Sequence, residues 1–77
     1  MMRGAVISKP IHPKERNMLR RLDQCDGEYL AMHGLADKLA CAALVHAGYA
    51  QRHGVFAHHY RITPKGEGYL ERLARAH

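Results

Sequence analysis

The chain has 77 residues, a formal charge of +5 and a composition that is 47% hydrophobic and 25% charged, which excludes a disordered polyelectrolyte. Its length allows one domain, and no apolar run approaches the roughly 20 residues that a membrane helix needs. The first residues also lack the continuous apolar centre of a signal peptide, so we expect a soluble, cytoplasmic protein.

The N-terminal part is predicted to lead into a helix. Residues 1–12 should form an arm or a short edge strand, and residues 13–76 the folded domain. A first helix is expected over about residues 13–24, because Pro13 suits the first helical position, where its missing N–H costs nothing. Apolar side chains then recur at helical spacing at Met18, Leu19 and Leu22.

Two further helices are predicted on either side of Gly34. Residues 28–33 suit a short second helix, with Asp26 as its N-cap. Residues 35–47 are rich in alanine and leucine, which are strong helix formers, and Gly48 provides a C-terminal cap. The short turn between these two helices is typical of a helix-turn-helix. We expect the buried arc of this third helix to hold Leu39, Ala40, Ala43, Leu44 and Ala47.

The rest of the chain changes to strand-like sequence and then returns to helix. Residues 49–52 and 57–62 are predicted strands, joined by a short connection that contains Gly54. Thr63 is a suitable N-cap for a last helix over about residues 64–75. The predicted fold class is therefore α+β, with a three-helix core, a two- or three-stranded β-wing and a C-terminal helix.

The stretch from Leu44 to Leu70 resembles the second half of a winged helix-turn-helix domain of the kind found in small MarR-like and PadR-like regulators. The resemblance rests on the helix exit Leu44-Val45-His46-Ala47-Gly48-Tyr49 and the helix entry Tyr60-Arg61-Ile62-Thr63-Pro64-Lys65-Gly66. It implies that the third helix enters the DNA major groove and that the wing touches the neighbouring backbone or minor groove. It also implies a homodimer, since such regulators usually match two half-sites.

Double-stranded DNA is the first predicted partner. Base readout needs hydrogen-bonding side chains, and the third helix offers only Lys38 as an obvious donor. The wing carries more cations and histidines, which could contact phosphates with an affinity that falls as salt rises. The predicted DNA-binding residues are Lys38, Arg52, His53, His58, His59, Arg61 and Lys65.

A protein-interaction module is the alternative prediction, because the third helix is alanine-rich and has few side chains that could read bases. In this hypothesis, small exposed residues let a partner approach closely. The alternative contact face consists of Asp37, Lys38, Cys41, Ala42 and Val45.

The sequence offers no support for catalysis or for a bound cofactor. It contains no recognisable Ser/His/Asp arrangement, Gly-rich phosphate loop or zinc-hydrolase motif, so we expect a protein that is not an enzyme. The seven histidines lack zinc-finger spacing, and Cys25 and Cys41 form no Cys-x-x-Cys pair. We therefore expect no metal site and two reduced cysteines.

Overall fold

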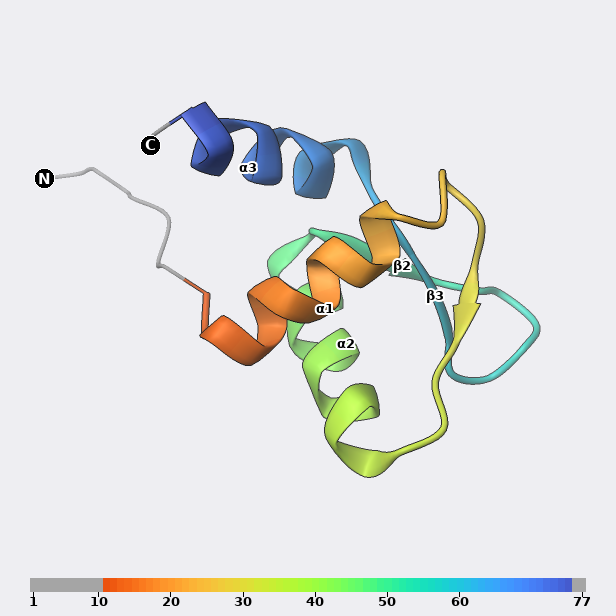
Figure 1. Cartoon of the computed structure of the whole chain (residues 1–77). Coiled ribbons are helices and arrows are strands. Elements are labelled where there is room, and N and C mark those ends of the chain that lie inside the picture. The colour runs from red at the N-terminus through yellow and green to blue at the C-terminus, as the bar shows by residue number, and fades with distance from the viewer. Residues whose placement is uncertain (1–10, 76–77) are drawn as a thin grey trace, which may run out of the picture.

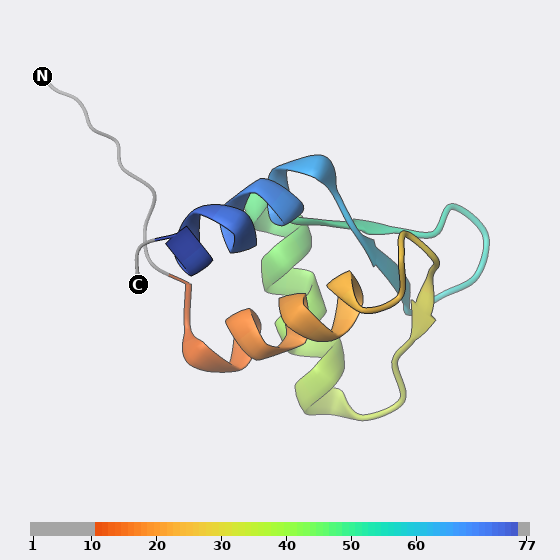
Figure 2. The same ribbon diagram turned by 45° about the horizontal axis from the view of Figure 1, so that its top comes forward.

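The computed structural model describes residues 11–75 as a small α+β domain with three helices and a three-stranded antiparallel sheet (Figure 1). In chain order the elements are α1 (Pro13–Asp23), β1 (Leu30–Ala31), α2 (Leu35–Ala47), β2 (Ala50–Arg52), β3 (His59–Ile62) and α3 (Pro64–Arg75). The β2–β3 hairpin projects from the end of the molecule opposite to the start of α1 (Figures 1 and 2). This layout is compatible with a winged-helix-like arrangement. The N-terminal arm or edge strand is predicted over residues 1–12, and residues 1–10 of it lie outside the described part of the chain.

Helix α1 begins where the sequence predicts, with Pro13 in its first turn. His12 is the N-cap: its Nδ1 accepts a hydrogen bond from the Lys14 N–H at 3.1 Å, and the Glu15 carboxylate accepts one from the His12 N–H at 3.4 Å. These reciprocal bonds form a capping box, which satisfies two of the free N–H groups at the helix start. The helix ends at Asp23, and its buried side consists of Met18, Leu19 and Leu22.

The short second helix predicted over residues 28–33 is wrong, because this segment is extended and contains strand β1. Its Leu30 pairs with Tyr60, and Ala31 pairs with His59, so the segment becomes one edge of the sheet. A six-residue helix forms too few internal hydrogen bonds to offset the cost of nucleation, whereas pairing with β3 satisfies the backbone. Asp26 is therefore not an N-cap; it adopts a φ of 53° in the turn after α1.

The absence of that helix also changes the architecture. Residues 28–33 and α2 therefore do not form the predicted helix-turn-helix. Residues 11–75 contain three helices, α1, α2 and α3, instead of the four that the sequence predicts. The sheet order is β1-β3-β2, so the central strand is β3. No helix in this described part is long and apolar enough to cross a membrane.

The fold-back after α2 confirms the prediction of a hairpin followed by a helix. Gly48 ends α2 with a φ of 87°, the left-handed conformation that glycine adopts without a steric penalty. Strands β2 and β3 then pair in antiparallel register, with Ala50 opposite Ile62. Thr63 joins the two ends of this unit, because its Oγ1 donates to the Gly48 carbonyl at 2.7 Å and accepts from the Gly66 N–H at 3.1 Å. The wing and α3 are thereby fixed to the end of α2.

The core lies between the helices and one face of the sheet. The buried arc predicted for α2 is confirmed in part: Leu44 is fully buried, and Ala40 and Ala47 pack against the core. Leu39 of that arc is wrong, since it is 61% exposed, and Cys41 is fully buried instead. The reason is that α2 is apolar on both sides, so its periodicity does not indicate which side meets α1 and the sheet. The buried residues are Met18, Leu19, Leu22, Met32, Cys41, Leu44, Tyr49, Ala50, Tyr60 and Ile62.

Candidate interaction surface on α2

Helix α2 exposes an apolar stripe to solvent. Leu35 is 72% exposed, Leu39 61% and Val45 37%, and Ala42 is exposed between them. Their spacing of four, three and three residues places them along one side of the helix for about 15 Å. We call these four residues the α2 apolar face. Burying the free part of each leucine in a complex would contribute about 1–2 kcal/mol.

The helix that carries this face is held at both ends. At its start, Arg21 of α1 forms an ion pair with Asp37, with 3.2 Å between Nη1 and Oδ2. At its end, Lys65 of α3 donates from Nζ to the Ala47 carbonyl at 2.9 Å, one of the carbonyls that the helix itself leaves free. Leu44 is fully buried in the core between these two anchors. The α2 apolar face is therefore presented on a fixed helix.

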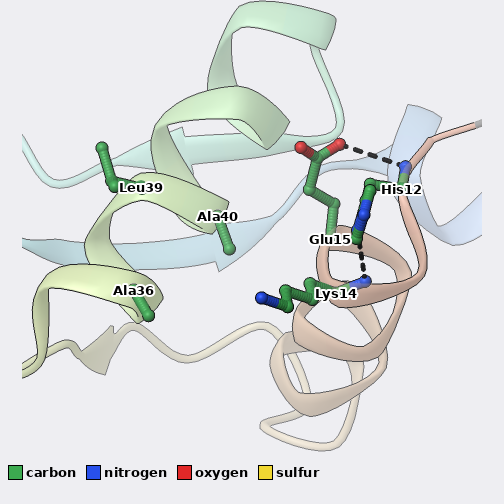
Figure 3. Close-up of a pocket in the computed structure, with 6 residues that line it drawn as sticks. All are labelled: His12, Lys14, Glu15, Ala36, Leu39 and Ala40. Carbon is green, nitrogen blue, oxygen red and sulfur yellow. Dashed lines mark hydrogen bonds between the residues drawn. The ribbon is translucent and has the colours of Figure 1, made fainter.

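Shallow grooves lie on both sides of α2. The groove toward α1 is lined by His12, Lys14, Glu15, Ala36, Leu39 and Ala40. In Figure 3 the Lys14 side chain extends from α1 toward α2, while the Glu15 carboxylate turns toward the His12 backbone. The groove on the other side lies between α2 and the sheet, and it is lined by Ala42, Val45, Arg52 and Tyr60. A partner that covers the α2 apolar face would meet a cation in each groove.

Two of the predicted DNA-binding cations already contact other residues of this chain. Lys65 donates to the end of α2, and its Nζ lies 5.2 Å from the centre of the Tyr49 ring. Arg61 donates from Nε and Nη2 to Gln51 Oε1 at 3.3 and 3.2 Å, and its guanidinium lies 4.9 Å from the centre of the Tyr29 ring. A phosphate contact by either side chain would have to replace or share these interactions.

The predicted histidines of the wing have mainly local contacts. His53 Nδ1 accepts hydrogen bonds from the Val55 and Phe56 N–H groups at 2.9 and 3.0 Å. His59 Nδ1 lies 3.0 Å from the Ala57 carbonyl, so this ring nitrogen acts as the donor. The His53 ring also packs against Tyr29 and Phe56, with ring centres 4.6 and 4.8 Å apart. These contacts shape the hairpin tip.

The His53→Ala variant is expected to loosen the hairpin tip while leaving global stability nearly unchanged. Removing the ring leaves the Val55 and Phe56 N–H groups without their acceptor, so their amide hydrogens should exchange about fivefold faster, in keeping with roughly 1 kcal/mol for a lost hydrogen bond. Hydrogen exchange followed by NMR measures this. His58→Asn is the control, since asparagine tolerates the φ of 60° at that exposed position; an equal effect there would contradict the role of His53.

Three predicted DNA-binding residues remain available for an external partner. Lys38 is half-buried on α2, Arg52 is exposed on β2, and His58 is exposed at the hairpin tip. None of the three takes part in an ion pair within residues 11–75. Sequence reasoning also missed the exposed leucines of α2 and the exposed tip residues Val55 and Phe56; the only signal for the tip was two large apolar residues in a hairpin connection.

Cys41 differs from the rest of the alternative contact face that the sequence predicts. The prediction that it is exposed is wrong, since its side chain is fully buried on the core side of α2. Burial, together with the nearby Asp37 carboxylate, raises the pKa of the Cys41 thiol from 9.0 to about 11. The other four residues of that face, Asp37, Lys38, Ala42 and Val45, are at least partly exposed.

The two thiols are expected to react with thiol reagents at very different rates. At pH 8 the native protein should be labelled at Cys25, which is partly exposed, and at Cys41 only after denaturation. Mass spectrometry after iodoacetamide treatment counts the labels; two labels on native protein would contradict the buried position of Cys41.

The raised pKa of Cys41 also makes the stability of the fold depend on pH. Because the folded pKa of Cys41 is raised, its neutral thiol favours the folded state below pH 9, and this contribution is lost as the pH rises through about 11.

Comparison of the chain with protein-family models, with curated proteins and with solved structures finds no match.

Proposed function

We propose that this protein is a protein-interaction module that binds its partner through the α2 apolar face. The observation that carries the proposal is the exposure of Leu35 and Leu39 on a helix whose other side is already packed in the core. Contiguous exposed apolar side chains on a helix are typical of protein-binding surfaces, where another apolar surface removes them from water. The fixed ends of α2 add to this, because a rigid face loses little entropy on binding.

The same helix is poorly suited to reading DNA bases. The floor of the major groove presents hydrogen-bond donors and acceptors, and leucine and valine side chains can offer only contacts to thymine methyl groups. On the exposed side of α2, Lys38 is the one side chain with several donors, and it lies at the edge of the α2 apolar face. Of the two functions predicted from the sequence, the interaction module therefore agrees better with the chemistry of α2.

DNA binding through the wing is a second candidate, favoured by one observation. Arg52 is exposed on β2, has no ion-pair partner in the described residues and belongs to a chain of net charge +5. Phosphates would be attracted to it without regard to sequence. This candidate predicts affinity for a mixed-sequence duplex that falls steeply between about 50 and 200 mM salt and weakens in Arg52→Ala.

A peptide-library selection tests the proposal even though the partner is unidentified. Displayed helical peptides are selected on the wild-type protein alone, and the enriched peptides are then tested on Ala42→Arg, which places a bulky charge in the middle of the α2 apolar face. We expect enriched peptides that bind the wild type and fail to bind Ala42→Arg or Val45→Glu. Peptides that bind all three proteins equally, or a protein that retains only duplex DNA at about 150 mM salt, would contradict the proposal.

A further inference from the structure

The charged side chains around the α2 apolar face include more cations than carboxylates. Lys14 lines the groove on the α1 side and Arg52 lines the groove on the sheet side. Lys38 lies on α2 itself, one turn before Ala42, and Arg21 lines a neighbouring groove between α1 and α2. Two carboxylates, Glu15 and Asp37, lie in the grooves on the α1 side. On the α1 side the two cations and the two carboxylates cancel in formal charge, whereas the cations on the sheet side are unopposed.

The two carboxylates are already occupied by neighbouring groups. Asp37 is paired with Arg21 at 3.2 Å, and the Glu15 carboxylate accepts the N–H of His12 in the capping box of α1. Figure 3 shows Glu15 turned toward His12 and Lys14 extended toward α2. In the part of the chain that the structure describes, Lys14, Lys38 and Arg52 have no ion-pair partner.

We infer that the α2 apolar face binds an amphipathic helix of another protein whose apolar stripe is flanked on both sides by carboxylates. This inference rests on the proposed function. A helix fits because the exposed side chains follow the four-three-three spacing of one helical stripe, and helices pack by matching such stripes at a small crossing angle. Carboxylates fit because each edge of the strip offers a cation without a partner, which favours an acidic ligand and repels a basic one.

The same charges argue against the other occupants of this face. A second copy of the chain, packed α2 against α2, would bring Lys14, Lys38 and Arg52 against like charges without adding a carboxylate that is free to pair. A DNA duplex would satisfy the cations but would place Leu35 and Leu39 against the polar floor of a groove. Of these three occupants, the acidic amphipathic helix is the one that satisfies both the cations and the leucines.

Two synthetic peptides of about 18 residues test the inference. They share one leucine stripe at helical spacing and are held helical by the same hydrocarbon staple; one carries glutamate on both flanks and the other carries lysine. Titrations are followed by NMR on the amide resonances of uniformly labelled full-length protein. We expect the glutamate peptide to shift α2 resonances and to bind about tenfold tighter or more at low salt, the effect expected of three exposed ion pairs, with a difference that narrows as salt rises.

Charge reversal provides the matched control. The triple variant Lys14→Glu, Lys38→Glu, Arg52→Glu should invert the preference and bind the lysine peptide more tightly. The triple variant Arg20→Glu, Arg72→Glu, Arg75→Glu makes the same change in net charge at exposed positions outside the two grooves, and it should keep the glutamate preference, although weakened.

The other possible results of these titrations overturn the inference, and each identifies which part of it is wrong. Equal binding of both peptides at α2 rejects the acidic partner and leaves the proposed function standing. Shifts of α2 that depend on protein concentration alone indicate a second copy as the occupant. If neither peptide shifts α2 resonances, the helical partner is rejected; if mixed-sequence duplex DNA shifts them instead, the proposed function fails as well.

Discussion

The Gly66→Ala variant is expected to lose about 3 kcal/mol of folding free energy, which corresponds to a fall in Tm of roughly 12–24 °C. Gly66 is buried in the first turn of α3, where a Cβ atom would overlap the Tyr49 carbonyl oxygen. The same atom would lie 2.8 Å from Ile62 Cγ1 and 3.2 Å from Leu19 Cδ1. Backbone and core atoms cannot move aside as a flexible side chain can, so α3 would have to shift. Thermal denaturation followed by circular dichroism measures the effect.

Gly68→Ala, in the same helix, is the control. A Cβ there would lie 3.4 Å from Arg72 Nη1, the far end of an exposed, flexible side chain. Alanine costs less backbone entropy than glycine in a helix, so this variant should be more stable than the wild type by about 0.5–1 kcal/mol. Similar Tm values for the two variants would show that α3 does not pack against Tyr49 as described.

The Leu39→Glu variant is expected to have the largest effect on binding. Leu39 is 61% exposed in the wild type, so the free energy of unfolding of the variant should stay within about 0.5 kcal/mol of the wild-type value. In a complex, however, a carboxylate in the α2 apolar face would be removed from water, and it would compete with the partner for Lys14, the cation in the same groove. We expect affinity for a selected peptide to fall about 30-fold or more, equivalent to about 2 kcal/mol. Fluorescence anisotropy measures the affinity.

Val55→Glu is the matched control for this prediction. Val55 is 82% exposed at the hairpin tip, so the substitution introduces the same charge in place of another exposed apolar residue. Its affinity for the peptide should stay within about threefold of the wild-type value, a difference of about 0.6 kcal/mol. A loss at Val55 as large as at Leu39 would move the binding site from α2 to the wing.

Much of the backbone can be predicted from the sequence because local signals agree with the fold. Pro13 marks the start of α1, Gly48 ends α2 in the left-handed conformation, and Thr63 caps α3, each as predicted. The error falls on residues 28–33, where the composition suits a helix and only the partner strand β3 decides otherwise. That strand lies about thirty residues further along the chain, since Leu30 pairs with Tyr60, and local propensity carries no information about such pairing.

The candidate site is harder to predict, because the sequence of α2 is apolar on two sides. Periodicity predicts Leu39 in the core and Cys41 on the surface, and the structure has the reverse. The pattern identifies the two stripes, but only the packing of α1 and the sheet selects which stripe is buried. The internal roles of Arg61 and Lys65 are likewise beyond sequence reasoning, because their partners Gln51 and Ala47 are distant along the chain.

Methyl NMR tests the central claim most directly, because it observes the α2 apolar face itself. Protein labelled at leucine and valine methyl groups is titrated, at about 150 mM salt, with a peptide from the library selection and separately with a mixed-sequence DNA duplex. We predict that the peptide shifts the methyl resonances of Leu35, Leu39 and Val45 and gives intermolecular nuclear Overhauser effects to them, while the duplex leaves them unchanged. Methyl resonances of α2 that stay fixed with the peptide, or that move with the duplex alone, would contradict the claim.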